Sequence, residues 1–294
     1  MFSRKSRADG GLALLAALAL GLYLIFLVLP LLLSLRSSFT NENPLRATNE
    51  FIGLRNYREM ASDVQLRDSL VFTLTLAVGV TLAANALGVA FAILLNRTHL
   101  SYRVMRTLAF LPQVLSGVIV GFVWQTILTQ DGLLNNVLTS VGLLDEPYPW
   151  LGSPRAALVS IGVVLTWVLS GFTTVVYLAA LQSVPIELND MATMDGVRGT
   201  QRFRKVTWPM IAPGTTISVT ISLITVLKLY DIIAVLTGGG PANSTQSTAL
   251  YIVRLAFTSD RLGYASAVAM LLLALSAVVA LAVTGALRRR EVTL

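Results

Sequence analysis

Long apolar runs constrain this chain more than any other feature of its sequence. Of its 294 residues, 55% are hydrophobic and 13% are charged, and the mean hydropathy is +0.73. These values lie outside the usual range of soluble domains. A helix needs about 20 apolar residues to cross a bilayer, and six runs in this chain approach or exceed that length. The buried core helix of a soluble protein would explain one such run, but not six. The pattern predicts an all-α integral membrane protein, a single transmembrane domain over 1–294, with spans at 11–35, 69–95, 104–129, 156–182, 210–237 and 262–287.

The first apolar run follows three basic residues, Arg4, Lys5 and Arg7, as the core of a signal peptide does. Its length of about 25 residues exceeds the 7–15 of a cleavable core, so we expect an uncleaved anchor. The sequence contains no cysteine. A disulfide framework and thiolate chemistry are therefore excluded.

Basic residues predict the orientation. If six spans place both termini on one side, the segments on that side hold 13 of the 22 lysines and arginines, and the opposite segments hold eight. Because basic residues accumulate on the cytoplasmic side, we expect a multi-pass membrane protein with both termini in the cytoplasm. The net charge of +7 then reflects orientation in the membrane and not binding to nucleic acid.

A polar segment, VPIELNDMATMDGVRGTQRFRKVTWPMIAP, interrupts the apolar sequence after the fourth span. The predicted orientation places residues 184–209, the 184–209 loop, in the cytoplasm. This segment is too charged and too long for a simple connector. Its physical chemistry leaves two interpretations open, a docking site for a cytoplasmic partner or an amphipathic loop that rests on lipid headgroups.

The loop has the pattern of two short helices joined by a turn. Pro185 can begin the first helix, and Gly196 can adopt the backbone angles of a turn. Pro209 and Pro213 suit the first turns of the next span. One face of the first helix would carry Leu188, Met191 or Ala192, and Asp195.

Short motifs occur along the chain in a fixed order. The loop reads VP-x-x-L-x-[E/D]-x-A-x-x-D-G, then x-RF and prolines at 209 and 213. Other segments are FIGLRNY at 51–57, Leu111–Pro112, Trp124, GLLN at 132–135, LYDIIAVLTGGGPANST at 229–245, LAF at 255–257 and GYASA at 263–267. Over about 230 residues this order resembles the permeases of bacterial carbohydrate ABC importers.

The resemblance implies a transport subunit and not an enzyme. In such importers the loop forms a coupling helix between the fourth and fifth spans, and it docks on a cytoplasmic ATPase. The implied partners are a second permease of distinct sequence, two ATPase subunits that carry ATP and Mg²⁺, an extracytoplasmic solute-binding protein, and a carbohydrate substrate. The chain itself lacks a G-x-x-x-x-G-K-[ST] phosphate loop, so we expect no cofactor on it.

The resemblance also assigns the coupling residues. Asp190 would anchor the docking surface, Gly196 would form the turn and Asp195 would brace it. Similar permeases carry Glu-Ala-Ala where this chain has Asp190, Met191 and Ala192, which shortens the acidic side chain and adds a flexible one. The full set is Leu188, Asp190, Met191, Ala192, Asp195, Gly196, Val197, Arg202 and Phe203.

A smaller set of polar and aromatic residues lies inside the predicted spans. Lys228 and Asp231 are three residues apart, and on one helix they would neutralise each other. Aromatic and amide side chains suit sugar recognition, although they equally suit helix packing. The candidates for a translocation pathway are Asn85, Trp124, Gln125, Lys228, Tyr230 and Asp231.

Other features point to packing. The pairs Ala84/Gly88 and Gly117/Gly121 allow helices to approach closely. His99 has no cysteine or second histidine near it, so we expect no metal site. The glycines of TGGGP at 237–241 predict a helix end and a flexible outer loop. An ion-gradient-driven secondary transporter and a membrane scaffold without transport remain alternatives, although no internal repeat is evident.

Overall fold

The computed structural model describes residues 15–45, 48–97, 99–185, 187–188, 191, 194, 196–197, 199–289 and 291. The chain divides into two compact units, residues 1–63 with 252–273 and residues 64–251 with 274–294. Within the described residues the fold is helical, with one isolated antiparallel bridge between Thr40 and Phe51. The predicted all-α fold is confirmed.

In the first unit, a helix runs from Leu15 to Ser37 and includes the π-helical η1 (Leu24–Val28) and α2 (Leu29–Ser37). The loop that follows is held by Asn56, a buried residue of α3 (Arg55–Met60). Its amide donates to the carbonyls of Ser38 at 2.8 Å and Thr40 at 3.0 Å. Gly263 N, near the start of α15 (Leu262–Arg288), donates to Glu42 O at 3.0 Å. These bonds give the loop a defined shape.

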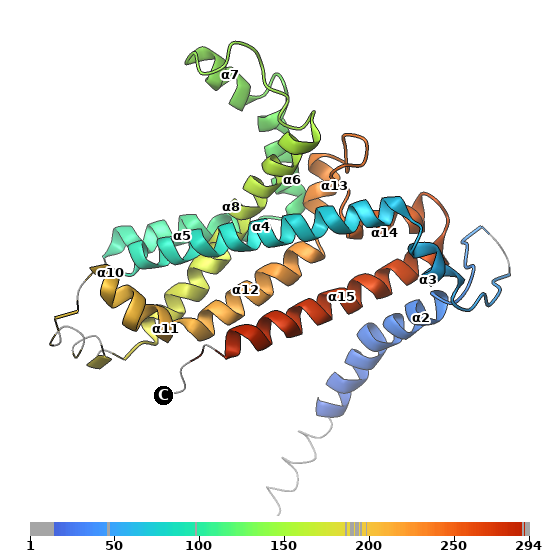
Figure 1. The fold of residues 1–294 in the computed structure, drawn as a ribbon, viewed down its shortest axis with the longest axis horizontal. Coiled ribbons are helices and arrows are strands. Elements are labelled where there is room, and N and C mark those ends of the chain that lie inside the picture. The colour runs from blue at the N-terminus through green and yellow to red at the C-terminus, as the bar shows by residue number, and fades with distance from the viewer. Residues whose placement is uncertain are drawn as a thin grey trace, which may run out of the picture. The chain divides into compact units, whose positions relative to one another are not determined.

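The second unit is built on α4 (Val64–Leu95) and α8 (Pro154–Gln182), which form its most extensive helix contact (Figure 1). α12 (Ala212–Leu227) packs against both helices, and α5 (Leu100–Val114) packs against α8. Small residues permit this approach. A Cβ on Gly171 of α8 would lie 2.5 Å from Ala109 O of α5, and one on Gly88 of α4 would lie 2.2 Å from Thr173 Oγ1.

The predicted span 104–129 is not one helix. α5 ends at Val114, residues Leu115 and Ser116 are extended, and α6 runs from Gly117 to Leu128. Pro112 lies in the last turn of α5, where it cannot donate a backbone hydrogen bond and clashes with the preceding turn. The apolar run is continuous, but its backbone is broken.

The predicted span 210–237 is also interrupted. α12 ends at Leu227, and α13 begins at Asp231 and ends at Leu236. Before α12, the helix Gly199–Met210 meets it at a bend of 69°. Among the described residues, five helices are long and apolar enough to cross a membrane, or six if this bent pair is one span. The bent helix consists of α10 (Gly199–Arg202), η2 (Phe203–Thr207) and α11 (Trp208–Met210).

Two connections of the second unit are ordered by side chains. After α6, Asn135 of α7 (Leu133–Ser140) donates to the carbonyls of Thr129, Gln130 and Tyr148 and accepts from Trp150 Nε1 at 2.9 Å. After α13, the helix ends as predicted, but the following segment is not an open connector. Thr245 is fully buried and bonds Gly240 O and Thr237 Oγ1 before α14 (Thr248–Phe257) begins.

Two glycines of α8 test the close packing. A Cβ on Gly171 overlaps the α5 backbone, whereas one on Gly162 meets only Leu76 Cδ1 at 3.9 Å. We expect Gly171→Ala to lower the free energy of unfolding by about 1–3 kcal/mol, because helix backbones cannot yield locally. Gly162→Ala should be neutral or stabilising by up to about 1 kcal/mol, because alanine favours a helix. Thermal unfolding of both variants in detergent measures the difference, and equal midpoints would contradict it.

Candidate functional site

The 184–209 loop presents apolar side chains to its surroundings. Met191 is 52% exposed and Met194 is 88% exposed, whereas Leu188 is half-buried. Gly196 lies in a turn with φ of 73°, where the sequence predicted one. Three of the predicted coupling residues, Asp190, Ala192 and Asp195, lie outside the described residues. Exposed methionines on a charged loop form an adaptable apolar surface.

The base of the loop rests on the ends of two spans. A pocket of about 270 Å³ lies where the end of α4, the end of α8 and the bent helix Gly199–Met210 meet. Arg202 and Phe203 of the bent helix line this pocket, and the centroid of the Phe203 ring lies 5.9 Å from that of the Trp208 ring. The other lining residues are Ile93, Asn96, Leu181, Val184, Gly199 and Thr207. The base of the loop and the ends of α4 and α8 therefore line one cavity.

A buried polar contact ties the same helices together above this base. Tyr177 of α8 is 1% exposed, and its hydroxyl donates to Asn85 Oδ1 of α4 at 3.0 Å. The Asn85 amide donates to Thr81 O at 2.8 Å. Next to this pair, Ala92, Tyr177, Leu178 and Ile211 form an apolar cluster. Asn85 thus joins α4 to α8 in this structure, and its predicted place in the pathway stays a prediction.

The expected Lys228–Asp231 pair is not formed. α12 ends before Lys228 and α13 begins at Asp231, so the two residues do not share a helix. The ion pairs seen among the described residues include Arg67–Asp68 and Arg261–Glu59. Lys228 is exposed, and Asp231 accepts a hydrogen bond from Ile232 N at 2.9 Å. Residues three apart lie side by side only on a continuous helix, and here the helix is interrupted between them.

The interruptions of the two spans meet at one point. A Cβ on Gly117, the first residue of α6, would lie 1.8 Å from Asp231 Oδ2. The Asp231 carboxylate therefore occupies the space that a side chain at position 117 would fill. Tyr230, exposed and adjacent, has an irregular backbone with φ of −129°. Gly117 is thus required by a close contact with α13, as the predicted packing pair implied.

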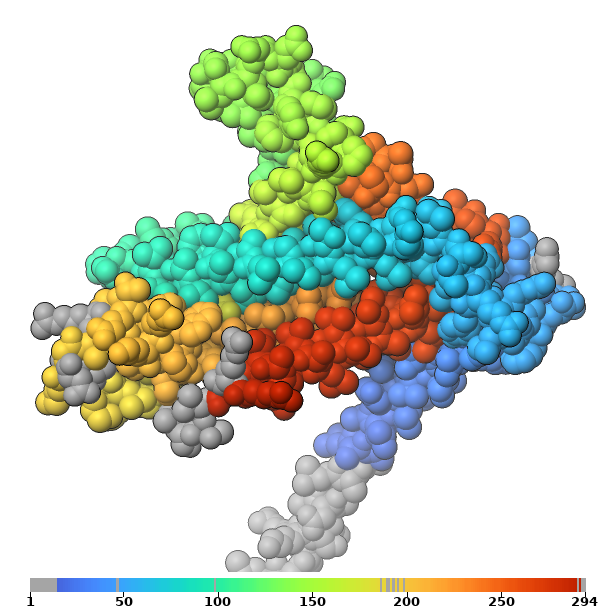
Figure 2. All heavy atoms as spheres, in the orientation of Figure 1, coloured from blue at the N-terminus to red at the C-terminus, as the bar shows by residue number. Residues whose placement is uncertain are grey.

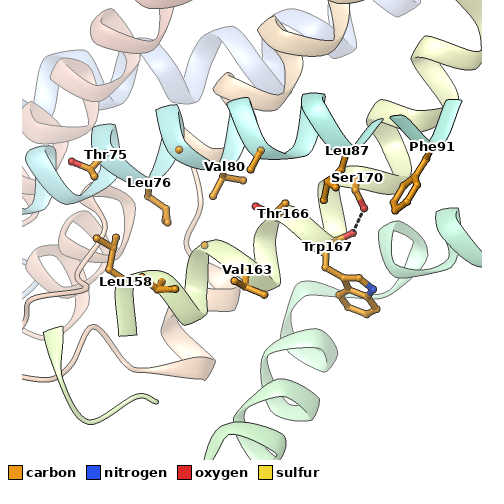
Figure 3. Close-up of a pocket in the computed structure, with 14 residues that line it drawn as sticks. Thr75, Leu76, Val80, Leu87, Phe91, Leu158, Val163, Thr166, Trp167 and Ser170 are labelled. Atoms are coloured by element: carbon orange, nitrogen blue, oxygen red, sulfur yellow. Dashed lines mark hydrogen bonds between the residues drawn. The ribbon is translucent and has the colours of Figure 1, made fainter. Parts of the chain in front are cut away.

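Trp124 and Gln125 are half-buried residues of α6. The Trp124 ring meets that of Trp167 on α8 edge to face, with centroids 5.6 Å apart. Trp167 also borders a groove of about 580 Å³ between α4 and α8, where apolar side chains of the two helices face one another (Figure 3). The Ser170 hydroxyl at this groove donates to Trp167 O at 2.8 Å. So apolar a groove does not suit a sugar.

Ser247 is a structural residue that the sequence reasoning did not single out. Its hydroxyl donates to Leu229 O at 2.8 Å, where the interruption of α12 and α13 leaves a carbonyl without a helical partner. Beside it, Thr248 N donates to Thr73 Oγ1 at 2.9 Å. The polar run STQST at 244–248 was the available signal, since an apolar environment requires such groups to find partners.

Residues 84–292 match the family model described as binding-protein-dependent transport system inner membrane component. Three relatives illustrate the match at the sequence level. A probable starch degradation products transport system permease, AmyD of Thermoanaerobacterium thermosulfurigenes, is 30% identical over 92% of this chain and 91% of its own. The lactose transport system permease LacF of Rhizobium radiobacter is 32% identical over 95% and 94%. A trehalose/maltose transport system permease, MalF of Thermococcus litoralis, is 31% identical over 82% and 80%.

A solved structure supports the fold. The chain is similar to one from a bacterial ABC transporter involved in the import of the acidic polysaccharide alginate, with a TM-score of 0.84. The alignment covers 97% of this chain and 98% of that one at 24% identity. The overall fold of this chain has therefore been observed experimentally.

The Gly117–Asp231 contact predicts coupling between two substitutions. Gly117→Ala should lower the free energy of unfolding by about 1–3 kcal/mol, because the new methyl group collides with the carboxylate. In an Asp231→Ala background the same change should cost at least about 1 kcal/mol less. Denaturation of the four proteins in detergent measures this coupling. Gly79→Ala, where the added Cβ meets no atom within 4 Å, is the control. Additive effects would show that the contact is not formed.

Proposed function

Because this chain belongs to the family of binding-protein-dependent transport system inner membrane components, we propose that it is a permease subunit of an ATP-driven sugar importer. The chain forms part of the pathway across the inner membrane. It binds no nucleotide itself, and the energy comes from ATP and Mg²⁺ on a separate ATPase. The observation that carries the proposal is the match over 84–292, which includes the 184–209 loop.

The substrate we propose is a di- or oligosaccharide. The relatives are named for starch degradation products, trehalose and maltose, lactose and multiple sugars. An extracytoplasmic solute-binding protein delivers the sugar, and a second, distinct permease completes the pathway. The lining includes the junction of the interrupted helices, where Tyr230 and Lys228 are exposed and Asp231 is half-buried.

The 184–209 loop couples the chain to two ATPase subunits. Met191 and Met194 supply exposed apolar surface, and Asp190 supplies the charged anchor at the docking site. The loop base contacts the ends of α4 and α8, so motion of a docked ATPase reaches the spans directly. This assignment requires the loop and both termini in the cytoplasm, as the distribution of basic residues favours.

The test is recovery of the ATPase with the chain. The tagged full chain is expressed with its neighbouring genes, and ATPase is quantified after purification from membranes. In this proposal Asp190 pairs with a basic residue of the ATPase at the docking site. We therefore expect Asp190→Lys to reduce recovery at least about tenfold, because placing like charges together in an interface costs several kcal/mol. Gly196→Arg should also reduce recovery, because position 196 has a positive φ that a side chain disfavours.

The control is Arg58→Glu, a charge reversal at an exposed residue of α3 far along the sequence from the loop, which should retain the ATPase. Uptake into vesicles supplied with ATP is measured in parallel. Uptake that survives Asp190→Lys but stops when a protonophore collapses the ion gradient would favour the secondary transporter and refute the proposal.

A further inference from the structure

A second pocket lies on α4, beside the residues that contact the loop base. Ile93 and Asn96 face the loop base, whereas Leu94, Leu95 and Arg97 line a groove between α4 and α5. The groove has a volume of about 410 Å³. Figure 2 shows the teal surface of α4 and α5 uncovered on the side viewed, next to the gold segment that contains α10.

The groove is apolar along its length and basic at one end. Its walls are Phe91, Leu94 and Leu95 of α4 and Met105 and Ala109 of α5. Met105 is 51% exposed and Leu94 is 63% exposed, so both walls are open to the surroundings. Arg97 and Tyr102 close the end of the groove.

Arg106 holds the two walls together. Its guanidinium donates to Leu95 O at 2.6 Å and 3.0 Å and to Arg97 O at 2.7 Å. These are carbonyls at the end of α4, which lack helical partners and carry the negative end of the helix dipole. The start of α5 is thereby fixed against the end of α4. These hydrogen bonds therefore hold the two walls of the groove in a fixed position.

Arg97 remains available for a ligand. It donates from Nη1 to the Tyr102 hydroxyl at 3.1 Å, and its guanidinium lies 5.4 Å from the Tyr102 ring. An arginine has five N–H donors, so this bond leaves most of them free. Arg103, one turn of helix before Arg106, is exposed. In the described part of the chain neither Arg97 nor Arg103 forms an ion pair.

The groove lies in a part of the sequence without acidic residues. No aspartate or glutamate occurs from Ser69 to Gln130. The 32 residues of α4 span about 48 Å, more than the about 30 Å of a hydrocarbon core, so its last turn reaches the level of the headgroups. An apolar groove that ends at the guanidinium of Arg97 at that level matches an acyl chain and an anionic headgroup.

We propose that the groove between α4 and α5 binds an anionic phospholipid. One acyl chain lies along Phe91, Leu94, Met105 and Ala109, and the phosphate meets Arg97 at the end of the groove. Arg103 follows the lining residue Tyr102 in the sequence and adds positive charge to the start of α5. The lipid occupies the face of α4 adjacent to the residues that hold the loop base. This site is independent of the sugar substrate and of the ATPase.

The test compares lipid binding by the unmodified full chain, four single variants and one double variant in mild detergent. Phosphatidylglycerol or phosphatidylcholine is titrated, and bound lipid is counted by native mass spectrometry. Arg97→Gln and Arg103→Gln should each weaken phosphatidylglycerol binding about fivefold, corresponding to about 1 kcal/mol per basic residue, with little change for phosphatidylcholine. Met105→Trp should weaken binding of both lipids, because it fills the groove without changing charge. Arg58→Gln, on exposed α3, is the matched control and should bind as the unmodified chain does.

Four results would overturn the proposal. Unchanged phosphatidylglycerol binding in the Arg97→Gln, Arg103→Gln double variant would show that these residues hold no headgroup. Unchanged lipid binding in Met105→Trp would show that no acyl chain occupies the groove and that the lipid is held by surface charge alone. Competition by soluble glycerol 3-phosphate at comparable concentration would identify a site for free phosphate. If the chain purified with its sibling permease retains no phosphatidylglycerol, the face is a protein contact and the lipid proposal also fails.

Discussion

The structure depends on one constraint, the hydrogen bonding of backbone groups wherever a span is interrupted. In lipid an unpaired carbonyl or amide costs several kcal/mol, so an interruption persists only if other groups supply the missing partners. The interruption between α12 and α13 uses the Ser247 hydroxyl for Leu229 O. The end of α4 uses the guanidinium of Arg106 for two carbonyls. At these two interruptions, polar side chains therefore supply the hydrogen bonds that the backbone would otherwise lack.

The interruptions have a functional meaning when considered together. Broken helices that meet within a membrane are a recurrent way to build a transport site, because the freed helix ends face a cavity. Here the beginnings of α6 and α13 meet at Gly117 and Asp231. The junction places an ionisable group next to a glycine, where small helix movements change the space available. This arrangement suits a pathway that must open and close.

The proposed coupling between the loop and the core would act through α4 and α8. Their ends line one cavity with the base of the 184–209 loop, and their buried faces are joined by Tyr177, Asn85, Thr173 and Ala84. Thr173 Oγ1 donates to Ala84 O at 2.8 Å, across the contact that Gly88 makes possible. Close packing transmits displacement because a well-packed interface deforms little. The proposed lipid site lies at the end of α4, between it and α5, where a bound headgroup would stabilise one position of α4.

The sequence alone determined the fold class, the family and the location of the polar loop. Span length and hydrophobicity are properties of composition, and motif order is a property of the chain, so neither requires tertiary information. The turn at Gly196 was also predictable, because only local backbone freedom decides it. Recognition of TGGGP as a helix end had the same local basis.

Only the tertiary structure decided where the spans break and which polar groups meet. Hydropathy averages over a window and cannot detect an extended pair such as Leu115–Ser116 inside an apolar run. The Lys228–Asp231 pair was wrong for that reason, since its geometry depended on a helix that ends at Leu227. In the structure the Asp231 carboxylate lies against Gly117, and the Leu229 carbonyl accepts a hydrogen bond from Ser247. Both contacts join segments that are distant in sequence. Local periodicity carries no information about such contacts, because they form only when the helices pack.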